Sequence, residues 1–202
     1  MSVQGLKNFI PEASLAYVER WLDGYPVLLK VKNNRKSKLG DYRKIPRGHQ
    51  ITINRDLSPY LFLITLTHEI AHMHTFDKFG FRVSPHGKEW KQTFATLLKE
   101  TFHIYPDDLQ PSMVKYIQNP KANFYAFSPF VAYFSQEEKE DTLFLKNLPK
   151  GTIFALNNKI FKKGELKRIK YICQEISTGK SYLIHELAPV KKYKKIDYEN
   201  IR

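Results

Sequence analysis

The sequence predicts an α+β protein made of a helix-rich domain in residues 1–135 and a small β-rich domain in residues 142–202. In the first part, apolar residues recur every three or four positions, which is typical of amphipathic helices. The second part holds short apolar runs separated by Gly, Asn and Pro, which is typical of strands and turns. The charged run at residues 136–141 marks the predicted boundary.

Four helices and two strands are expected in the first domain. The helices are predicted at residues 11–22, 59–79, 88–102 and 107–118, and the strands at residues 27–32 and 50–55. Pro59 suits the first turn of its helix and Gly80 suits its end. Residues 33–48 carry six cations and one acid, which predicts a basic loop or hairpin. Residues 119–135 show no clear period and receive no assignment.

Four strands are predicted in the second domain, separated by Pro, Gly and Asn residues. They are expected at residues 142–148, 152–156, 167–174 and 180–185. The chain has a single cysteine, Cys173, which we expect to be a buried small hydrophobe. One cysteine excludes an intrachain disulfide and an all-cysteine metal site, and it fits a reducing, cytoplasmic setting.

Composition and charge narrow the classes of protein. Hydrophobic residues make up 42% of the chain and aromatic residues 14%, which indicates a folded protein rather than a disordered one. The first residues lack the apolar run of a secretory signal, and no stretch is long enough to suggest a membrane span. The net charge of +13 favours an anionic partner, most commonly nucleic acid, although a generally lysine-rich composition would also produce it.

The strongest chemical signal is the HExxH pattern formed by His68, Glu69 and His72 inside the helix predicted at 59–79. A spacing of four residues places the two imidazoles on one face of a helix, about one turn apart, so that both can bind one ion. Catalytic zinc sites have three protein ligands, and a neighbouring glutamate can serve as general base. The alternative is a pair of ordinary helical histidines, but the mid-helix position favours the zinc site.

The third ligand is expected to be His86, at the head of the next predicted helix. His74 lies two residues from His72 and therefore points to a different side of the helix. His103 lies far along the chain. Glu89 remains a rival, either as the ligand itself or as a hydrogen-bond partner of one.

Several short motifs together resemble the SprT-like metallopeptidases, which are relatives of the Spartan DNA-repair protease. The resemblance covers roughly residues 10–103 and rests on residues 27–29, 35–42 with Gly40, 51–53, 66–72 and 85–90. It implies a zincin-like domain in which a small mixed sheet packs against the active-site helix. It also implies one zinc ion per chain on His68, His72 and His86, with Glu69 catalytic and Trp90 supporting the site by packing. The position of Trp90 on an apolar stripe instead favours a plain core residue.

The resemblance further implies a protein substrate and a DNA partner, single-stranded or damaged. Many SprT-like proteins carry a four-cysteine zinc ribbon after the protease domain, which this chain cannot form. A degenerate ribbon or a small barrel is expected in its place. Eight cations are candidates for nucleic-acid contacts: Arg35, Lys36, Lys38, Lys162, Lys163, Lys167, Arg168 and Lys170. A solvated charged face over an ordinary β core is the alternative.

The sequence therefore predicts a zinc-dependent endopeptidase that associates with DNA and acts on DNA-bound or crosslinked proteins. Glu69 would take a proton from water and pass it to the leaving amine. No residue stands out as the donor for an oxyanion. Two alternatives stay open: a nucleic-acid-binding protein with a non-catalytic zinc site, and a peptidase for one dedicated regulatory protein.

Overall fold

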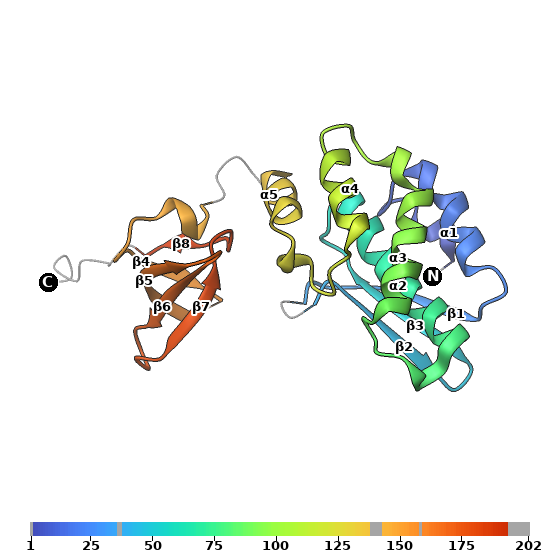
Figure 1. Ribbon diagram of the computed structural model, residues 1–202, viewed down its shortest axis with the longest axis horizontal. Coiled ribbons are helices and arrows are strands. Elements are labelled where there is room, and N and C mark those ends of the chain that lie inside the picture. Colours follow the sequence, from blue (N-terminus) through green and yellow to red (C-terminus); the bar gives the residue numbers. More distant parts are fainter. Residues whose placement is uncertain (1, 36–37, 138–142, 158, 194–202) are drawn as a thin grey trace, which may run out of the picture. The chain divides into compact units, whose positions relative to one another are not determined.

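The computed structural model describes residues 2–35, 38–137, 143–157 and 159–193. The chain is α+β, as predicted, with helices and two separate sheets (Figure 1). It divides into two compact units, Met1–Phe130 and Val131–Arg202. Each unit has its own sheet, and each is described by itself.

The first unit contains a mixed three-stranded sheet. Its strands are β1 (Val27–Lys32), β2 (Gly40–Ile45) and β3 (Gly48–Asn54), in the order β1-β3-β2. β1 runs parallel to β3, whereas β2 runs antiparallel to it. The two predicted strands are confirmed, and the predicted basic segment forms a hairpin whose strand β2 lies at the edge of the sheet.

The central element of this unit is α2 (Pro59–Phe79), which contacts β2 and β3 on one side and α3 (Lys88–Glu100) on the other (Figure 1). Pro59 occupies the first turn, and the helix ends at Gly80, which has a φ of 60°. A positive φ suits glycine because it has no Cβ. Since α2 is covered by both neighbours, most of its side chains are buried.

Short helices complete the first unit and lead out of it. They are η1 (Val3–Leu6), η2 (Glu12–Ser14), α1 (Leu15–Leu22), η3 (Gly80–Arg82), η4 (Phe102–Ile104), α4 (Gln110–Gln118), η5 (Phe124–Ala126) and α5 (Ser128–Glu137). The segment that received no assignment from the sequence therefore contains η5 and most of α5. The boundary between the two units falls within α5.

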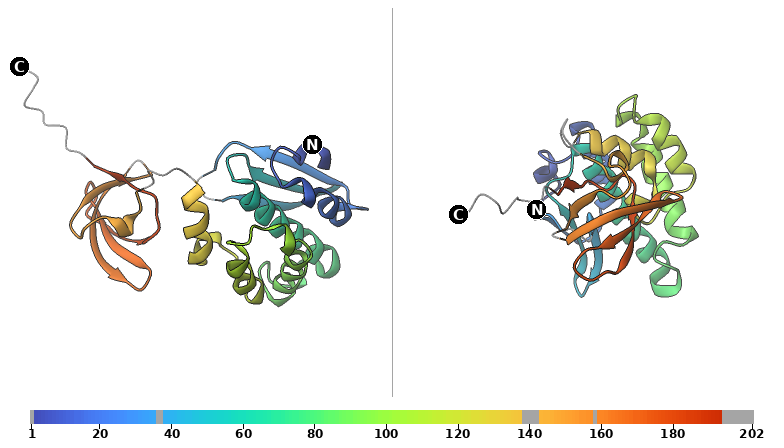
Figure 2. Two further views of the ribbon diagram at one scale, coloured as in Figure 1. Left: turned by 90° about the horizontal axis from the view of Figure 1, so that it is seen from above. Right: turned by 90° about the vertical axis from the view of Figure 1, so that its left-hand side faces the viewer.

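The second unit is built on a five-stranded antiparallel sheet, which is curled (Figure 2). Its elements are η6 (Leu145–Asn147), β4 (Ile153–Leu156), β5 (Lys159–Lys167), β6 (Lys170–Glu175), β7 (Ser181–His185) and β8 (Lys191–Lys192). The strand order is β7-β6-β5-β4-β8. Phe154, Phe161 and Cys173 are at the centre of its core, so Cys173 is buried as expected.

In this unit one strand prediction was wrong, and two strands, β5 and the short β8, were not predicted. The predicted strand at 142–148 is instead η6, with a single bridge between Phe144 and Pro189; residue 142 lies outside the described residues. β5, the longest strand of the unit, was not predicted. Its four lysines and the irregular register between Lys163 and Leu166 mask the alternation expected of a strand.

Among the described helices, none has the length and hydropathy required to span a bilayer.

Candidate metal centre

Three histidine side chains converge beside α2. His68 and His72 lie one turn apart on that helix, and His86 lies just before the start of α3. The Nε2 atom of His72 is 3.1 Å from that of His68 and 3.0 Å from that of His86. The third side of this triangle, from His86 to His68, measures 3.3 Å. Three ring nitrogens therefore point at one small volume.

Hydrogen bonding among the histidines cannot satisfy this triangle. A ring nitrogen of neutral imidazole carries either a proton or a lone pair, so it either donates or accepts. Among three such atoms, at least one pair must place two lone pairs or two protons against each other. A cation at the common point of the three lone pairs removes this conflict. The three histidines could therefore hold a metal ion.

The size of the triangle fits zinc. Tetrahedral coordination at the usual Zn–N distance of about 2.0–2.1 Å places two ligand nitrogens about 3.3–3.4 Å apart. The observed separations of 3.0, 3.1 and 3.3 Å are close to this value. Within the described part of the chain, His68, His72 and His86 are the only group of three with metal-binding geometry.

The other sequence candidates for the third ligand lie outside this group. His74 instead places its Nε2 atom 2.7 Å from the backbone oxygen of Trp21. The ring of His103 packs against Tyr17. Glu89 is likewise not among the converging residues, and its carboxylate lies beside Gly87.

Burial keeps the three imidazoles neutral. It lowers the pKa of His68 well below its ordinary value, and the neighbouring His72 and His86 add to this shift. Burial also lowers the pKa of His72 to about 4 and, to a smaller extent, that of His86. Neutral imidazole is the form that binds a metal, so the site is prepared for one at neutral pH.

Trp90 packs against the three histidines. Its side chain is fully buried, and its ring centroid lies 4.6, 5.3 and 4.7 Å from those of His68, His72 and His86. The indole Nε1 also donates to the backbone oxygen of His68, at 3.4 Å. Trp90 therefore contacts all three imidazoles at once and restricts their orientation.

Tyr42 of β2 covers His72 from the opposite direction. The two rings are almost parallel, at 8°, with centroids 6.2 Å apart. The Tyr42 hydroxyl lies 3.0 Å from Nδ1 of His49, a buried residue of β3. Tyr42 and His49 lie on neighbouring strands of one sheet, so this contact fixes the Tyr42 ring, and the Tyr42 ring in turn restricts the orientation of His72.

Glu69 lies against the edge strand, where its residue is only 6% exposed. Burial, with a smaller contribution from Asp41, raises the pKa of its carboxyl to about 8, although Arg35, Lys38 and a hydrogen bond from the Tyr42 backbone act in the opposite direction. A Cβ atom on Gly40 would lie 2.5 Å from Oε1 of Glu69. Only glycine therefore lets β2 approach this carboxylate so closely.

A cavity of about 800 Å³ opens beside the histidines. Its walls come from β2, from α2, from the connection to α3 and from residues 122–125. His68, Glu69, His72 and His86 all line it. A molecule in the cavity would therefore meet the three imidazoles and the carboxylate together.

Comparison with known protein families gives a result consistent with this geometry. Residues 13–111 match the model of the SprT-like family. This part of the chain is similar to the SprT-like family. No curated protein and no solved structure matches the chain. The matched residues include the entire sheet of the first unit, α2, α3 and all three converging histidines.

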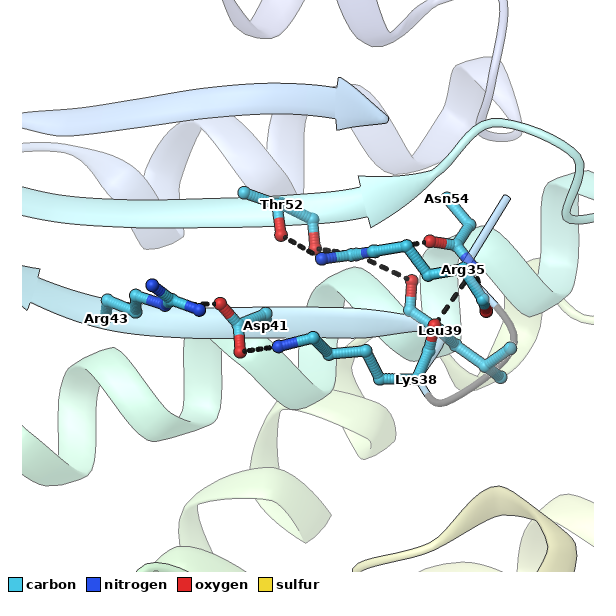
Figure 3. A network of polar contacts seen from close by, with 7 residues as sticks. All are labelled: Arg35, Lys38, Leu39, Asp41, Arg43, Thr52 and Asn54. Atoms are coloured by element: carbon cyan, nitrogen blue, oxygen red, sulfur yellow. Dashed lines mark hydrogen bonds and ion pairs between the residues drawn. The ribbon is translucent and has the colours of Figure 1, made fainter. Parts of the chain in front are cut away.

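A polar network holds the segment that leads into β2 (Figure 3). Arg35 donates from Nε to Asn54 and from Nη1 to the hydroxyl of Thr52, both at 2.8 Å. Asn54 in turn donates to the backbone oxygen of Lys38, at 3.0 Å. These bonds fix both ends of the loop that leads into β2, and so the position of Gly40.

The same network includes a carboxylate held by two cations. Asp41 accepts from Lys38 at 2.6 Å and from Arg43 at 2.7 Å (Figure 3). Lys38 and Arg35 lower the pKa of Glu69, in opposition to the effect of burial. The cations of this segment therefore pair with Asp41 and also influence the pKa of the buried Glu69.

The eight cations proposed for nucleic-acid contacts are not equivalent. Lys163 is 3% exposed, and its ammonium donates to backbone oxygens of the η6 segment, so proposing it as a phosphate contact was wrong. Arg35 uses its guanidinium within the network described above, and Lys38 is paired with Asp41. Lys36 lies outside the described residues. The exposed cations are Lys162, Lys167, Arg168 and Lys170.

The sequence did not identify Tyr42 or His49 as neighbours of the metal centre. Both depend on the antiparallel pairing of β2 with β3, which brings Lys44 opposite His49 and Tyr42 opposite Ile51. A lone tyrosine in a basic segment carries no spacing signal. Gly40 carried a partial signal, because a glycine at the start of a strand often marks a close backbone approach.

Proposed function

We propose that this chain is a zinc-dependent endopeptidase with one zinc ion held by His68, His72 and His86. The observation that supports this most strongly is the convergence of three neutral imidazole nitrogens next to a buried carboxylate in one cavity. A purely structural zinc site usually has four protein ligands and no use for an adjacent carboxylate. Three nitrogens beside an open cavity are the pattern of a catalytic site.

When bound, zinc would polarise a substrate carbonyl and lower the pKa of water. Glu69 is the group that moves the proton. Its carboxylate takes a proton from the attacking water and delivers it to the amine that leaves. Its burial raises the pKa of the carboxyl, and therefore its basicity. Trp90 and Tyr42 keep the imidazoles in place throughout the reaction.

The edge strand β2 is the part of the site that orients a polypeptide. Residues 38–44 line the cavity, and β2 has no partner strand on its outer side among the described residues. An extended peptide would pair with such an edge through its backbone, which aligns it without requiring one particular sequence. This favours a protein substrate over a small molecule.

The proposal is tested by comparing Glu69→Gln with Glu89→Gln, since Glu89 is a nearby carboxylate outside the converging group. Cleavage of an unfolded, casein-like protein should fall by about 10²- to 10⁴-fold in Glu69→Gln. Zinc content, measured by elemental analysis, should stay near one per chain in both variants. Glu89→Gln should retain cleavage. Equal cleavage by wild type and Glu69→Gln would refute the enzymatic proposal, and bound zinc without any cleavage would support a non-catalytic site.

We also propose that the peptidase associates with DNA and acts on DNA-bound or crosslinked proteins. The support is the net charge of +13 and the four exposed cations on or near β5 and β6, namely Lys162, Lys167, Arg168 and Lys170. Phosphate contacts predict that affinity for single-stranded DNA falls steeply as salt rises. A flat salt response would instead favour a dedicated protein substrate. Wild type and a Lys167→Ala, Arg168→Ala, Lys170→Ala variant should be compared by fluorescence anisotropy.

A further inference from the structure

The cavity continues beyond the histidines into an aromatic end. Phe76, one turn after His72 on α2, lines the cavity there together with Phe81 of η3. Their ring centroids are 4.9 Å apart at an angle of 79°, an edge-to-face pair. Phe76 also contacts the rings of Tyr42 and His49. The aromatic end is thus continuous with the side chains that surround His72.

Phe81 lines the cavity, and other side chains leave it almost fully exposed. It is 91% exposed, whereas its partner Phe76 is half-buried. The positive φ of Gly80 ends α2 immediately before it and directs the chain into η3. An isolated exposed apolar side chain carries little information. This one lines the cavity of the proposed catalytic site, and it lies on the connection that carries His86.

A neighbouring phenylalanine shows the contrast. Phe79 is only two residues away, but it does not line the cavity, and the ammonium of Lys78 lies over its ring. Phe81 instead lines the cavity together with Val83 and Pro85 of the same connection. The connection after α2 therefore adds apolar side chains to the cavity wall.

We propose that Phe76 and Phe81 form a substrate subsite that takes a bulky apolar side chain of a polypeptide lying along β2. The inference rests on the proposed peptidase function and adds a substrate class to it: extended segments with exposed aromatic or large aliphatic residues. Such residues are buried in folded proteins, so the subsite selects locally unfolded protein. The edge strand would bind the substrate backbone, and the aromatic end would bind one of its side chains.

The first experiment measures cleavage of three peptides of Ala, Ser and Gly that differ at one central position, which is Phe, Leu or Ser. Wild type should prefer the Phe peptide over the Ser peptide in kcat/KM. Because an aromatic contact is worth about 0.5–1.5 kcal/mol, Phe81→Ser should reduce this preference by about 2- to 12-fold. Phe81→Leu should retain part of it. Phe79→Ala, the matched control, should leave both the preference and the zinc content unchanged.

A binding measurement separates failure of the subsite from failure of the peptidase proposal. Zinc-loaded Glu69→Gln should bind the labelled Phe peptide more tightly than the Ser peptide in fluorescence anisotropy. Adding Phe81→Ser should remove that difference. Equal binding of the two peptides by Glu69→Gln, or an unchanged preference in Phe81→Ser, would overturn the subsite while leaving the catalytic proposal intact. Absence of cleavage by zinc-loaded wild type, with binding preference retained, would overturn the peptidase and keep the subsite as a peptide-binding site.

Discussion

Both units of this protein bury ionisable side chains, but the groups that interact with these side chains differ between the units. In the second unit, Lys163 and Glu175 are each 3% exposed. In the first unit, the 6% exposed Glu69 lies beside His68, His72 and His86. The second unit supplies partners for its charges from its own residues. The first leaves three nitrogens that no arrangement of their protons can satisfy.

The two buried charges of the second unit have structural partners. The Lys163 ammonium donates to the backbone oxygen of Leu145 at 2.8 Å and to that of Leu148, and it lies 3.7 Å from the ring centroid of Tyr171. Glu175 accepts from Thr178 at 2.8 Å and from Tyr182 at 3.0 Å, and it also pairs with Lys159. Both charges fasten segments of the fold to the sheet.

The difference shows how to interpret a buried charge. A buried group whose partners lie within the same unit indicates architecture, because folding alone accounts for it. Buried groups that converge on a cavity and lack a complete set of partners indicate a ligand. Variants of the two kinds of group should therefore separate cleanly into those that lose metal or activity and those that lose stability.

The largest expected effect is on zinc affinity. His86→Ala should weaken zinc binding by more than about 100-fold, because loss of a direct ligand exceeds the 10- to 100-fold cost of losing a supporting residue. The measurement is competition with a chromophoric chelator. His103→Ala, a histidine outside the site, is the matched control and should bind zinc like wild type. Zinc retained by His86→Ala but lost by Glu89→Gln would move the third ligand to Glu89.

Gly40→Ala should reduce kcat/KM by about 100-fold with little loss of zinc, because a misplaced catalytic group costs rate rather than metal binding. The added Cβ would lie 2.5 Å from Oε1 of Glu69 and 2.9 Å from Cγ2 of Thr65, so the carboxylate must move. Zinc content and peptide cleavage should be measured on the same preparation. Wild-type kcat/KM in this variant would show that the position of Glu69 is not set by β2.

The fold was predictable where local patterns determine it. The alternation and helical periods located β1, β3, α1, α2 and α3 within a few residues. β5 was missed because its lysines do not alternate with apolar residues; Lys163 points inward and is satisfied by backbone oxygens that the sequence does not place there. The strand predicted at 142–148 failed because an apolar run alone does not distinguish a strand from a short helical segment packed on a core.

The residues of the candidate site that lie close together in the sequence could be predicted, and most of those brought in from other elements could not. His68, Glu69 and His72 lie within one helical turn, so spacing alone brings them together. His86 was the expected third ligand, but setting aside its rival Glu89 required the path of the connection after α2, which spacing does not determine. Tyr42 and Phe81 reach the site through sheet pairing and through the turn at Gly80, and neither feature leaves a periodic signal in the sequence.

In the second unit, Lys163→Met should lower the free energy of unfolding by about 1–3 kcal/mol, because buried carbonyl oxygens lose their donor. Lys162→Met is the matched control, since Lys162 is adjacent but exposed. Both tryptophans, Trp21 and Trp90, lie in the first unit, so tryptophan fluorescence should report an unchanged transition there. Amide NMR signals of β5 and β6 during urea titration should show the loss. Equal stability of the two variants would show that the Lys163 contacts do not stabilise the unit.

The smallest expected effect depends on pH. Hydrogen bonding to Lys159 and to Thr178 lowers the pKa of Glu175 from its ordinary value of 4.5 to about 2. A carboxyl whose pKa is lower in the folded state stabilises the fold above the unfolded pKa, and this stabilisation is lost as pH falls towards the folded pKa. Glu175→Gln should therefore be less stable than wild type above about pH 5, with a difference that shrinks between pH 4.5 and 2.

Urea titrations followed by the amide signals of β6 and β7, at several pH values, measure this dependence. Glu165→Gln is the matched control, because Glu165 is an exposed residue that pairs with Lys150 at the surface, where an ion pair contributes little. The difference in free energy of unfolding between wild type and Glu175→Gln could instead stay constant down to pH 2. That result would mean that Glu175 stabilises the fold through its shape or polarity rather than through its charge. The buried charges of the second unit would then no longer be explained by their ionic partners, and the contrast with the histidine cluster would rest on Lys163 alone.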